Sequence, residues 1–358
     1  MVVYLPLQGQ RCGPPSFIMQ QPPKDIFLNV NKIMSYNDAV YSYIVTPRGV
    51  GKTYGFFKWC INRYIKHDEC TVYLRRSRNN IDLAFTGNTF YQVMADNFPD
   101  IKYKILTSKN IFQIGDDPVI TGASLLDDES LKSVGYPKVK YIILDEFLSE
   151  SEGYLRNEIF KIKNIRETVL RLRSGKFFFL GNSVSYTNIY FKEAGFSKND
   201  FKRECTFRNK RLLYIPKCEK FKEYKKSTEF GSLDVGTDFG DYAIENKFLL
   251  DDSPFIMKKP KKSECMFCIV FDNFILGFWR DKDKKYYISE KWMNSCRNKF
   301  FVDVSDVRLG FSHISIPGSG AWVLNDFLWR LKNSSVFFES HFCQTIFNEI
   351  LPYLKGGI

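Results

Sequence analysis

The sequence lacks any apolar run long enough to cross a membrane, so we expect no membrane contact. Its first residues, Met1 to Leu7, lack a basic stretch followed by a long apolar one, which argues against a signal peptide. The nine cysteines include one Cys-x-x-Cys pair, Cys265 and Cys268, without a second pair. Strand residues three apart face opposite ways, which argues against shared zinc ligation. We therefore expect reduced thiols, as in a cytosol.

Acidic residues are also in deficit, with 40 Asp and Glu against 52 Lys and Arg. The resulting net charge of +12 is typical of proteins that bind polyanions, most often nucleic acid. No internal repeat is visible, which disfavours a repeat architecture. A length of 358 residues indicates two domains, and 44% hydrophobic residues are ample for a core.

The most informative segment is a phosphate-binding loop between an apolar strand at 39–45 and a helix from about residue 53. In such loops, backbone N–H groups at the helix N-terminus bind phosphate oxygens. We expect Lys52 to contact the β- and γ-phosphates of ATP and Thr53 to ligate Mg²⁺. The sequence departs from the usual pattern at Thr46, where a glycine is common. The loop comprises Thr46, Pro47, Arg48, Gly49, Val50, Gly51, Lys52 and Thr53.

A second motif completes an ATPase site. The run 140–144 is apolar, as in a buried parallel strand, and Asp145 and Glu146 follow it directly. Ligands bind at the carboxyl ends of such strands. We expect Asp145 to hold Mg²⁺ and Glu146 to activate the attacking water as general base. The pair favours hydrolysis over phosphoryl transfer to a small acceptor.

Two further polar groups are candidates. Asn182 follows a strand at 176–180 and either senses the γ-phosphate or caps a turn. Arg171 and Arg173 lie between the acid strand and that strand, and an arginine supplied to a neighbour's γ-phosphate stabilises transition-state charge. On a chain this basic, a solvated surface is the competing interpretation.

The order of elements predicts an α/β fold, a P-loop NTPase of the additional-strand, catalytic-glutamate type with a mostly parallel sheet. We associate the additional strand with residues 71–75. Strands are expected at 40–45, 71–75, 101–106, 110–114, 139–144 and 176–180, and helices at 53–66, 88–97, 155–171 and 186–194.

Four regions follow from this pattern. Residues 1–30, rich in Pro and Gln, form an extended arm, and residues 31–200 form the ATPase domain. Residues 201–253 form a basic linker, since 201–226 holds ten Lys or Arg against three Glu. Residues 254–358 form a smaller α+β domain. In that domain we expect a hairpin within 265–279, a strand at 285–288, and helices at 321–332 and 341–351.

The motifs together resemble one family, the DNA-packaging (encapsidation) ATPases of small phi29-type tailed phages. The resemblance runs from about residue 31 to at least residue 290. It rests on the phosphate loop and on the following segments: Met34-Ser35-Tyr36, Tyr73-Leu74-Arg75-Arg76, Asp145-Glu146-Phe147, Leu180 to Ser185, Phe230-Gly231, Gly236-Thr237, and Asn273-Phe274-x-Leu276-Gly277-x-Trp279.

The resemblance implies a homopentameric ring at the portal, or connector, of a procapsid in the host cytoplasm, not in the mature virion. The ring drives double-stranded DNA inward, with a small structural RNA as a further partner. It implies a C-terminal domain like an RNase H nuclease that has lost its catalytic acids. Arg171 matches the family's trans-acting finger, with Arg173 in reserve, and Lys132 matches a lysine near the subunit interface.

For the DNA contact we expect Arg75, Arg76 and Arg78 to form a basic loop in the pore that grips the phosphate backbone. The competing interpretation is that Arg75 or Arg76 pairs with a carboxylate of the ATPase site. Other functions stay open: a helicase, a non-hydrolysing scaffold, or a packaging enzyme with an active nuclease. A nuclease needs converging carboxylates, for which Asp272, Asp283 and Glu290 are available.

Overall fold

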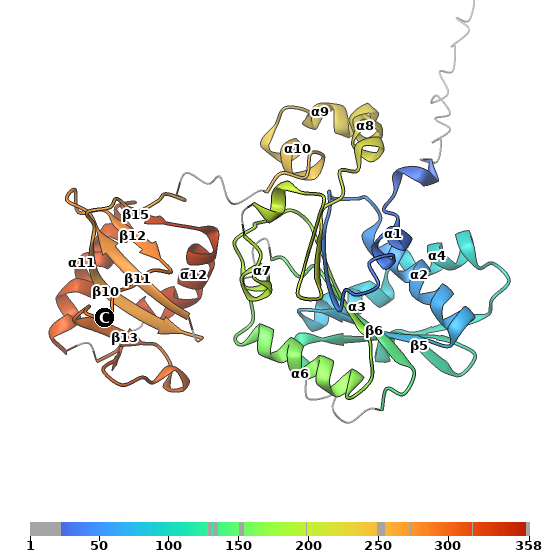
Figure 1. Ribbon diagram of the computed structural model, residues 1–358, viewed down its shortest axis with the longest axis horizontal. Coiled ribbons are helices and arrows are strands. Elements are labelled where there is room, and N and C mark those ends of the chain that lie inside the picture. Colours follow the sequence, from blue (N-terminus) through green and yellow to red (C-terminus); the bar gives the residue numbers. More distant parts are fainter. Residues whose placement is uncertain are drawn as a thin grey trace, which may run out of the picture.

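The computed structural model describes residues 23–127, 131, 135–149, 154–197, 199–248, 255–272, 274–316 and 318–355. A larger α/β body and a smaller C-terminal body lie side by side (Figure 1). Most of the expected N-terminal arm, residues 1–22, lies outside the described residues, as does Lys132. Within the described ranges, no helix is both long and apolar enough to cross a membrane.

The larger body is built on a nine-stranded sheet in the order β3-β4-β5-β2-β6-β7-β1-β9-β8. Strands β5, β2, β6, β7, β1 and β9 run parallel, and only the outer pairs β3–β4, β4–β5 and β8–β9 are antiparallel. The expected mostly parallel sheet is confirmed. Its strands are β1 (Tyr41–Val45), β2 (Cys70–Arg75), β3 (Tyr103–Leu106), β4 (Ile111–Ile114), β5 (Asp117–Ser124), β6 (Val139–Asp145), β7 (Lys176–Gly181), β8 (Cys205–Arg208) and β9 (Arg211–Tyr214).

The order differs from our expectation in one respect. The strand expected at 71–75 exists as β2, but it pairs with β6 on the side away from β1. The strand inserted between β1 and β6 is β7, which pairs with both. Sequence order does not reveal spatial order, because parallel strands are joined by crossovers of variable reach.

Side chains alternate between the two faces of the large sheet, and this alternation divides the buried apolar residues into two cores, one on each face. Phe177 and Phe179 pack on one face of β7 with Tyr43, whereas Phe178 packs on the other face with Phe56. Helices α1, α2, α3 and α4 lie on the Phe178 face, and α6 and α7 lie on the opposite one. Their bounds are α1 (Val30–Met34), α2 (Lys52–His67), α3 (Arg78–Thr86), α4 (Thr89–Asn97), α6 (Glu158–Leu170) and α7 (Ile189–Ala194).

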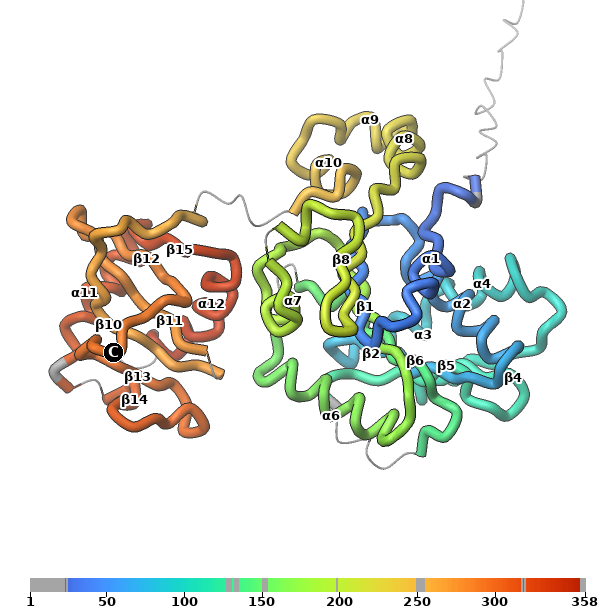
Figure 2. Tube along the Cα trace, in the orientation of Figure 1, coloured from blue at the N-terminus to red at the C-terminus, as the bar shows by residue number. Residues whose placement is uncertain are grey.

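The expected basic linker contains regular structure. Strands β8 and β9 extend the large sheet beyond β1. Three short helices then form a lobe above this sheet (Figures 1 and 2). Thr228 and Thr237 cap the second and third of these by accepting hydrogen bonds from backbone N–H groups. The helices are α8 (Glu219–Ser227), α9 (Glu229–Asp234) and α10 (Asp238–Ala243).

The C-terminal body has a six-stranded mixed sheet in the order β14-β13-β10-β11-β12-β15. The expected hairpin is present, with β10 antiparallel to β11, and β13 pairs parallel with β10. Both expected helices are also present. The elements are β10 (Glu264–Phe271), β11 (Phe274–Arg280), β12 (Tyr286–Ser289), β13 (Asn298–Phe301), β14 (Ser312–His313), β15 (Val336–Phe338), α11 (Ala321–Lys332) and α12 (His341–Lys355).

The expectation that Cys265 and Cys268 face opposite sides of a strand is wrong, because a β-bulge interrupts the strand between them. The register of β10 shifts between Cys265 and Phe267, so the simple alternation of side chains fails there. As a result, the thiols of both Cys265 and Cys268 contact the thiol of Cys296. The cysteines of the described residues are free, and no metal-ligand cluster occurs among those residues.

Candidate nucleotide site

The phosphate loop has the expected strand–loop–helix context. It leaves the end of β1 and enters α2, which begins at Lys52. Gly49 and Gly51 have φ angles of 89° and 81°, in the left-handed region that only glycine adopts freely. The glycines therefore allow the tight bend that turns backbone N–H groups toward a bound anion.

Lys52 lies at the centre of this site. Its Nζ donates to Thr46 Oγ1 at 3.0 Å and to Asn182 Oδ1 at 2.6 Å. Burial lowers the pKa of Lys52 to about 8, against the opposing effect of Asp145 and Glu146. Thr46, in place of the usual glycine, supplies a hydroxyl that holds the lysine. Asn182 uses its side-chain oxygen for the same purpose rather than for a turn.

Asp145 is the second anchor. It ends β6 with only 2% of its surface exposed, and its Oδ2 accepts from both Thr53 Oγ1 and Tyr73 OH at 2.7 Å. A third donor, Arg75 Nη2, lies 3.4 Å away. Burial and the adjacent Asp145 charge raise the pKa of Tyr73 well above its ordinary value, so the phenol stays protonated as a donor. Thr53 and Asp145, from different elements, are thus brought together.

Glu146 adjoins Asp145 in an unusual conformation. Its φ of 58° lies in the left-handed region, which costs a non-glycine residue energy and often occurs at functional sites. Its carboxylate is 62% exposed, and Arg75 Nη1 lies 2.5 Å from Oε2. The base candidate therefore faces solvent beside the phosphate loop, held by an arginine.

Arg75 and Arg76 are not placed as a free pore loop. Arg75 bridges the two acids of the site. Arg76 is buried in an ion pair with Glu158, at 3.0 Å, and it donates to the backbone carbonyl of Phe147 at 2.8 Å. The competing interpretation, a pair with a carboxylate of the ATPase site, describes Arg75, because β2 ends next to β6. Arg76 also pairs internally, but with Glu158 of α6. Of the three arginines, Arg78 alone is exposed, at the start of α3.

The two finger candidates differ sharply. Arg173 donates to the backbone carbonyl oxygens of Val169, at 2.5 Å, and of Leu170, at 3.3 Å, which caps the end of α6. Arg171 is exposed, and its backbone has φ 50° and ψ −121°. Leu172, beside it, is fully exposed. Arg171 therefore projects from a surface turn, whereas the Arg173 side chain is held against the end of α6.

The sequence did not predict the apolar side chains that pack around the phosphate loop. Ile26, Val50 and Phe221 form a separate buried cluster, and the Phe27 ring lies 3.2 Å from where a Cβ on Gly51 would be. Lys225 of α8 donates to the carbonyl oxygen of Arg48 at 3.0 Å. The segment before α1 and the helical lobe thus enclose the phosphate loop. No local motif signals this, since the partners are far apart in sequence.

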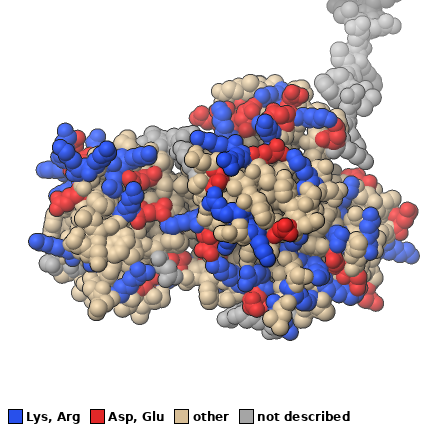
Figure 3. Space-filling model, in the orientation of Figure 1, with Lys and Arg blue, Asp and Glu red and all other residues tan. Residues whose placement is uncertain are grey.

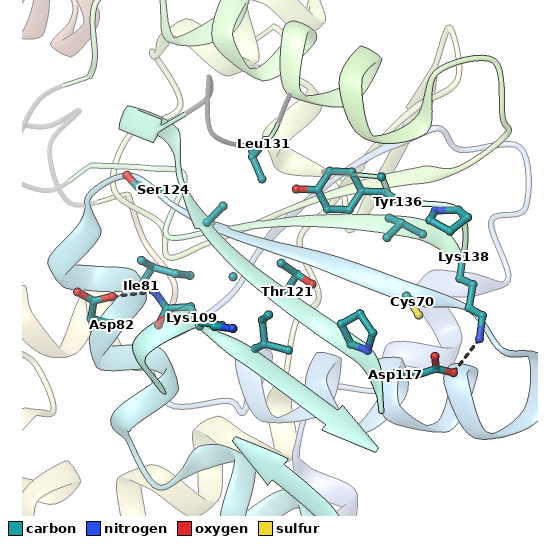
Figure 4. A pocket seen from close by; sticks show the side chains of 18 of the residues that line it. Cys70, Ile81, Asp82, Lys109, Asp117, Thr121, Ser124, Leu131, Tyr136 and Lys138 are labelled. Atoms are coloured by element: carbon teal, nitrogen blue, oxygen red, sulfur yellow. Dashed lines mark hydrogen bonds and ion pairs between the residues drawn. The ribbon is translucent and has the colours of Figure 1, made fainter. Parts of the chain in front are cut away.

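A large hollow lies elsewhere on the same domain. It has a volume of about 530 Å³ and runs along β5, between α3 and residues 135–139 (Figure 4). An ion pair between Asp117 and Lys138, at 2.7 Å, closes one end. Of the expected site residues that the structure describes, only Arg78 lines it. The hollow is therefore distinct from the nucleotide site.

Comparison with known proteins gives the family. Residues 23–352 match the model of the podovirus DNA encapsidation protein (Gp16). The chain belongs to the podovirus DNA encapsidation protein family. It is 32% identical to the DNA packaging protein of Bacillus phage B103 over 289 residues, which cover 79% of this chain and 87% of that protein. The DNA packaging protein of Bacillus phage phi29 is 32% identical over 288 residues, covering 79% and 85%.

Solved structures agree with this assignment. A chain of the bacteriophage phi29 viral genome packaging motor assembly matches with a TM-score of 0.69 and 28% identity, covering 92% of this chain and 99% of that chain. The N-terminal domain of the phi29 DNA packaging ATPase matches with a TM-score of 0.50 and 31% identity, covering 55% and 99%. This encapsidation protein is therefore a nucleotide-binding ATPase of a phage genome-packaging motor.

Proposed function

We propose that the protein is an ATP-driven double-stranded DNA translocase that works as a homo-oligomeric ring, of five subunits by family resemblance, at the procapsid portal in the host cytoplasm. The observation that carries this proposal is the convergence of Lys52, Thr53, Asp145 and Glu146 on one edge of the sheet. A structural RNA is the further partner that the family resemblance implies.

The donor set fits Mg²⁺. The Thr53 hydroxyl and the Asp145 carboxylate are hard oxygen ligands within one hydrogen bond of each other. When bound, Mg²⁺ would neutralise charge on the β- and γ-phosphates of ATP. Thr53 and Asp145 would hold the ion, while Lys52 and the loop N–H groups bind the phosphates. Thr46 and Asn182 would keep Lys52 in position.

Glu146 is the proposed general base. A carboxylate that takes a proton from water must be exposed to the reacting water and correctly oriented. The structure gives Glu146 that exposure, and the hydrogen bond from its own N–H to Asp145 Oδ1, at 3.0 Å, orients its backbone. Arg75 Nη1 holds its carboxylate, so the orientation of the proposed base depends on Arg75.

Arg171 is proposed to act on the ATP of a neighbouring subunit. Its exposed turn follows α6, and the site of its own subunit already has Arg75 and Lys52 as cations. A charge supplied in trans makes turnover depend on the contact between subunits. Lys132 keeps its proposed place near that interface, and Arg78 is the remaining candidate for contact with the DNA backbone.

The test is ATP hydrolysis with and without double-stranded DNA, for wild type, Glu146→Gln and Arg171→Ala, and for the two variants mixed. We expect DNA to stimulate the wild type and each variant alone to be inactive. Mixing should restore part of the activity, because some interfaces then combine an intact Glu146 with an intact Arg171. Lys66→Ala, which removes an exposed charge on α2, is the control and should behave as wild type.

Two results would contradict the proposal. Normal hydrolysis by Arg171→Ala would remove the trans role of Arg171. Absence of any DNA stimulation in the wild type would argue against a DNA translocase.

A further inference from the structure

A short segment of the ATPase domain, Arg156 and Asn157, contacts the C-terminal domain at one place. Arg156 Nη1 lies 2.8 Å from Asp303 Oδ2, and its Nη2 lies 3.1 Å from Asp306 Oδ2. Arg156 also donates to Ser305, and the Asn157 N–H donates to Asp272 Oδ2 at 2.8 Å. Two consecutive residues therefore engage three carboxylates.

The three carboxylates lie together because of the strand order. Asp272 directly follows β10, and Asp303 follows the adjacent parallel strand β13, with Val270 opposite Phe301 in the register. Asp306 follows in a turn with only 4% of its side chain exposed. Carboxylates this close repel one another unless a cation lies among them. Among the described residues, Arg156 is the cation that pairs with Asp303 and Asp306.

The carboxylates show the effect of this arrangement. Hydrogen bonds from Ser305 and from Arg156 lower the pKa of Asp303 to about 2. Burial raises the pKa of Asp272, whose Oδ1 has no hydrogen-bond partner among the described residues. The cluster therefore depends on Arg156 and Asn157 for much of its charge compensation.

The same segment reaches the nucleotide site from its other end. Glu158, two residues after Arg156, is buried and accepts from Arg76, from Tyr190 and from the Leu155 N–H at 2.6 Å. Arg76 in turn donates to the carbonyl oxygens of Glu146, at 3.4 Å, and Phe147, at 2.8 Å. Charged contacts thus reach from the backbone at Glu146 through Arg76 to Glu158, and the short chain segment from Glu158 back to Arg156 leads on to the acids of the C-terminal domain.

We propose that Arg156 couples the nucleotide site to the C-terminal domain: its guanidinium pairs with Asp303 and Asp306 beside Asp272, while the turn that carries it is fixed through Glu158 and Arg76 to the backbone of Glu146. The proposal rests on the proposed role of Glu146 in the ATP site. A shift of the Glu146 backbone on nucleotide binding then changes how the C-terminal domain is held.

The domain contact offers a matched control. Lys192 of α7 pairs with Glu290, and its Nζ lies 4.4 Å from the centre of the Phe342 ring. This contact holds the same two domains, and neither Lys192 nor Glu290 makes a hydrogen bond or ion pair with Glu158 or Arg76 among the described residues, although Tyr190, two positions before Lys192, donates to Glu158. If Arg156 only holds the domains together, loss of Lys192 should have a similar effect.

The test is hydrogen exchange of the full chain with and without a non-hydrolysable ATP analogue, for wild type, Arg156→Ala, Arg156→Lys and Lys192→Ala. In the wild type and in Lys192→Ala, we expect the analogue to change protection at residues 301–307. Arg156→Ala should abolish that change while its analogue affinity stays near that of wild type, and Arg156→Lys should retain part of it. DNA-stimulated hydrolysis should fall roughly tenfold in Arg156→Ala, within the usual range for coupling between sites, with basal hydrolysis unchanged.

Retention of the analogue-dependent change in Arg156→Ala would overturn the proposal, as would equal loss in Lys192→Ala. Exchange requires only nucleotide binding, whereas the translocase proposal is tested by hydrolysis and DNA stimulation. A failure of the coupling proposed for Arg156 is therefore distinguishable from a failure of the translocase proposal.

Discussion

Replacing Arg171 with glycine should make the protein more stable and at the same time inactive. Residues 170–173 form a tight turn closed by a hydrogen bond of 2.9 Å from the Arg173 N–H to the Leu170 carbonyl. Arg171, with φ 50° and ψ −121°, occupies the first central position of this turn. Turns of this geometry have positive φ at that position and strongly prefer glycine there. The arginine is therefore held in a conformation that a side chain disfavours.

The magnitude follows from two opposing terms. A non-glycine residue in a sparsely populated region costs about 1–3 kcal/mol, and glycine removes that cost. Glycine also loses more backbone entropy on folding than alanine, by about 0.5–1 kcal/mol. Arg171→Gly should therefore be more stable than Arg171→Ala by about 1 kcal/mol, which raises Tm by about 2–4 °C for a domain of this size.

The assay compares Arg171→Gly, Arg171→Ala and wild type by thermal unfolding and by DNA-stimulated ATP hydrolysis. Both variants should lose turnover by at least about 10³-fold, since neither supplies the charge in trans. A glycine variant no more stable than the alanine variant would show that the turn is not strained. A glycine variant with normal turnover would show that the Arg171 side chain is not needed for hydrolysis and would refute its action in trans.

Two further predictions concern the nucleotide site. Since the pKa of Lys52 is lowered to about 8 in the free protein, binding of ATP above that pH requires uptake of a proton, and affinity should fall about tenfold per pH unit. Calorimetry in buffers of different ionisation enthalpy measures this uptake. Equal affinity at pH 7 and pH 9, roughly one unit either side of the pKa of about 8, would contradict the prediction. Arg76→Met should destabilise the fold by about 3–5 kcal/mol in urea unfolding, because Glu158 is left charged and buried, and adding Glu158→Gln should recover much of the loss. Lys32→Met, which breaks the exposed pair with Glu204, is the control and should cost less than about 1 kcal/mol.

The parts of the site that sequence predicted are those with local patterns. The phosphate loop, the apolar run before Asp145 and the strand before Asn182 each depend on a few consecutive residues. Helix α3 was missed although Ser77 gives a local signal, since its side chain accepts from the Asn80 N–H as an N-cap. Helix α8 was missed because its many charges obscured an amphipathic pattern that buries Phe221.

The parts that sequence did not predict depend on distant residues. Arg76 and Glu158 are 82 positions apart, and nothing in either local sequence identifies the partner. Tyr73 and Arg75 alternate with Leu74 on β2, so both face one side, but only the pairing of β2 with β6 shows that this side holds Asp145 and Glu146. Spatial order of strands therefore decided which arginines belong to the site.

The arrangement of Arg75 implies that turnover has two requirements. Arg75 contacts both acids, so an electrostatic attraction holds Glu146 as long as Arg75 stays in place. On the proposed mechanism, Glu146 becomes an effective base only when that contact loosens, and charge on the transferred phosphate is then stabilised by Arg171 of a neighbour. A subunit with an intact site but no neighbour would satisfy the first requirement and not the second. Hydrolysis by isolated subunits should therefore be slow for a reason that lies outside their own site. On the coupling proposed for Arg156, the pair of Arg76 with Glu158 and the short chain segment from Glu158 to Arg156 give the C-terminal domain a route to the backbone that carries Glu146.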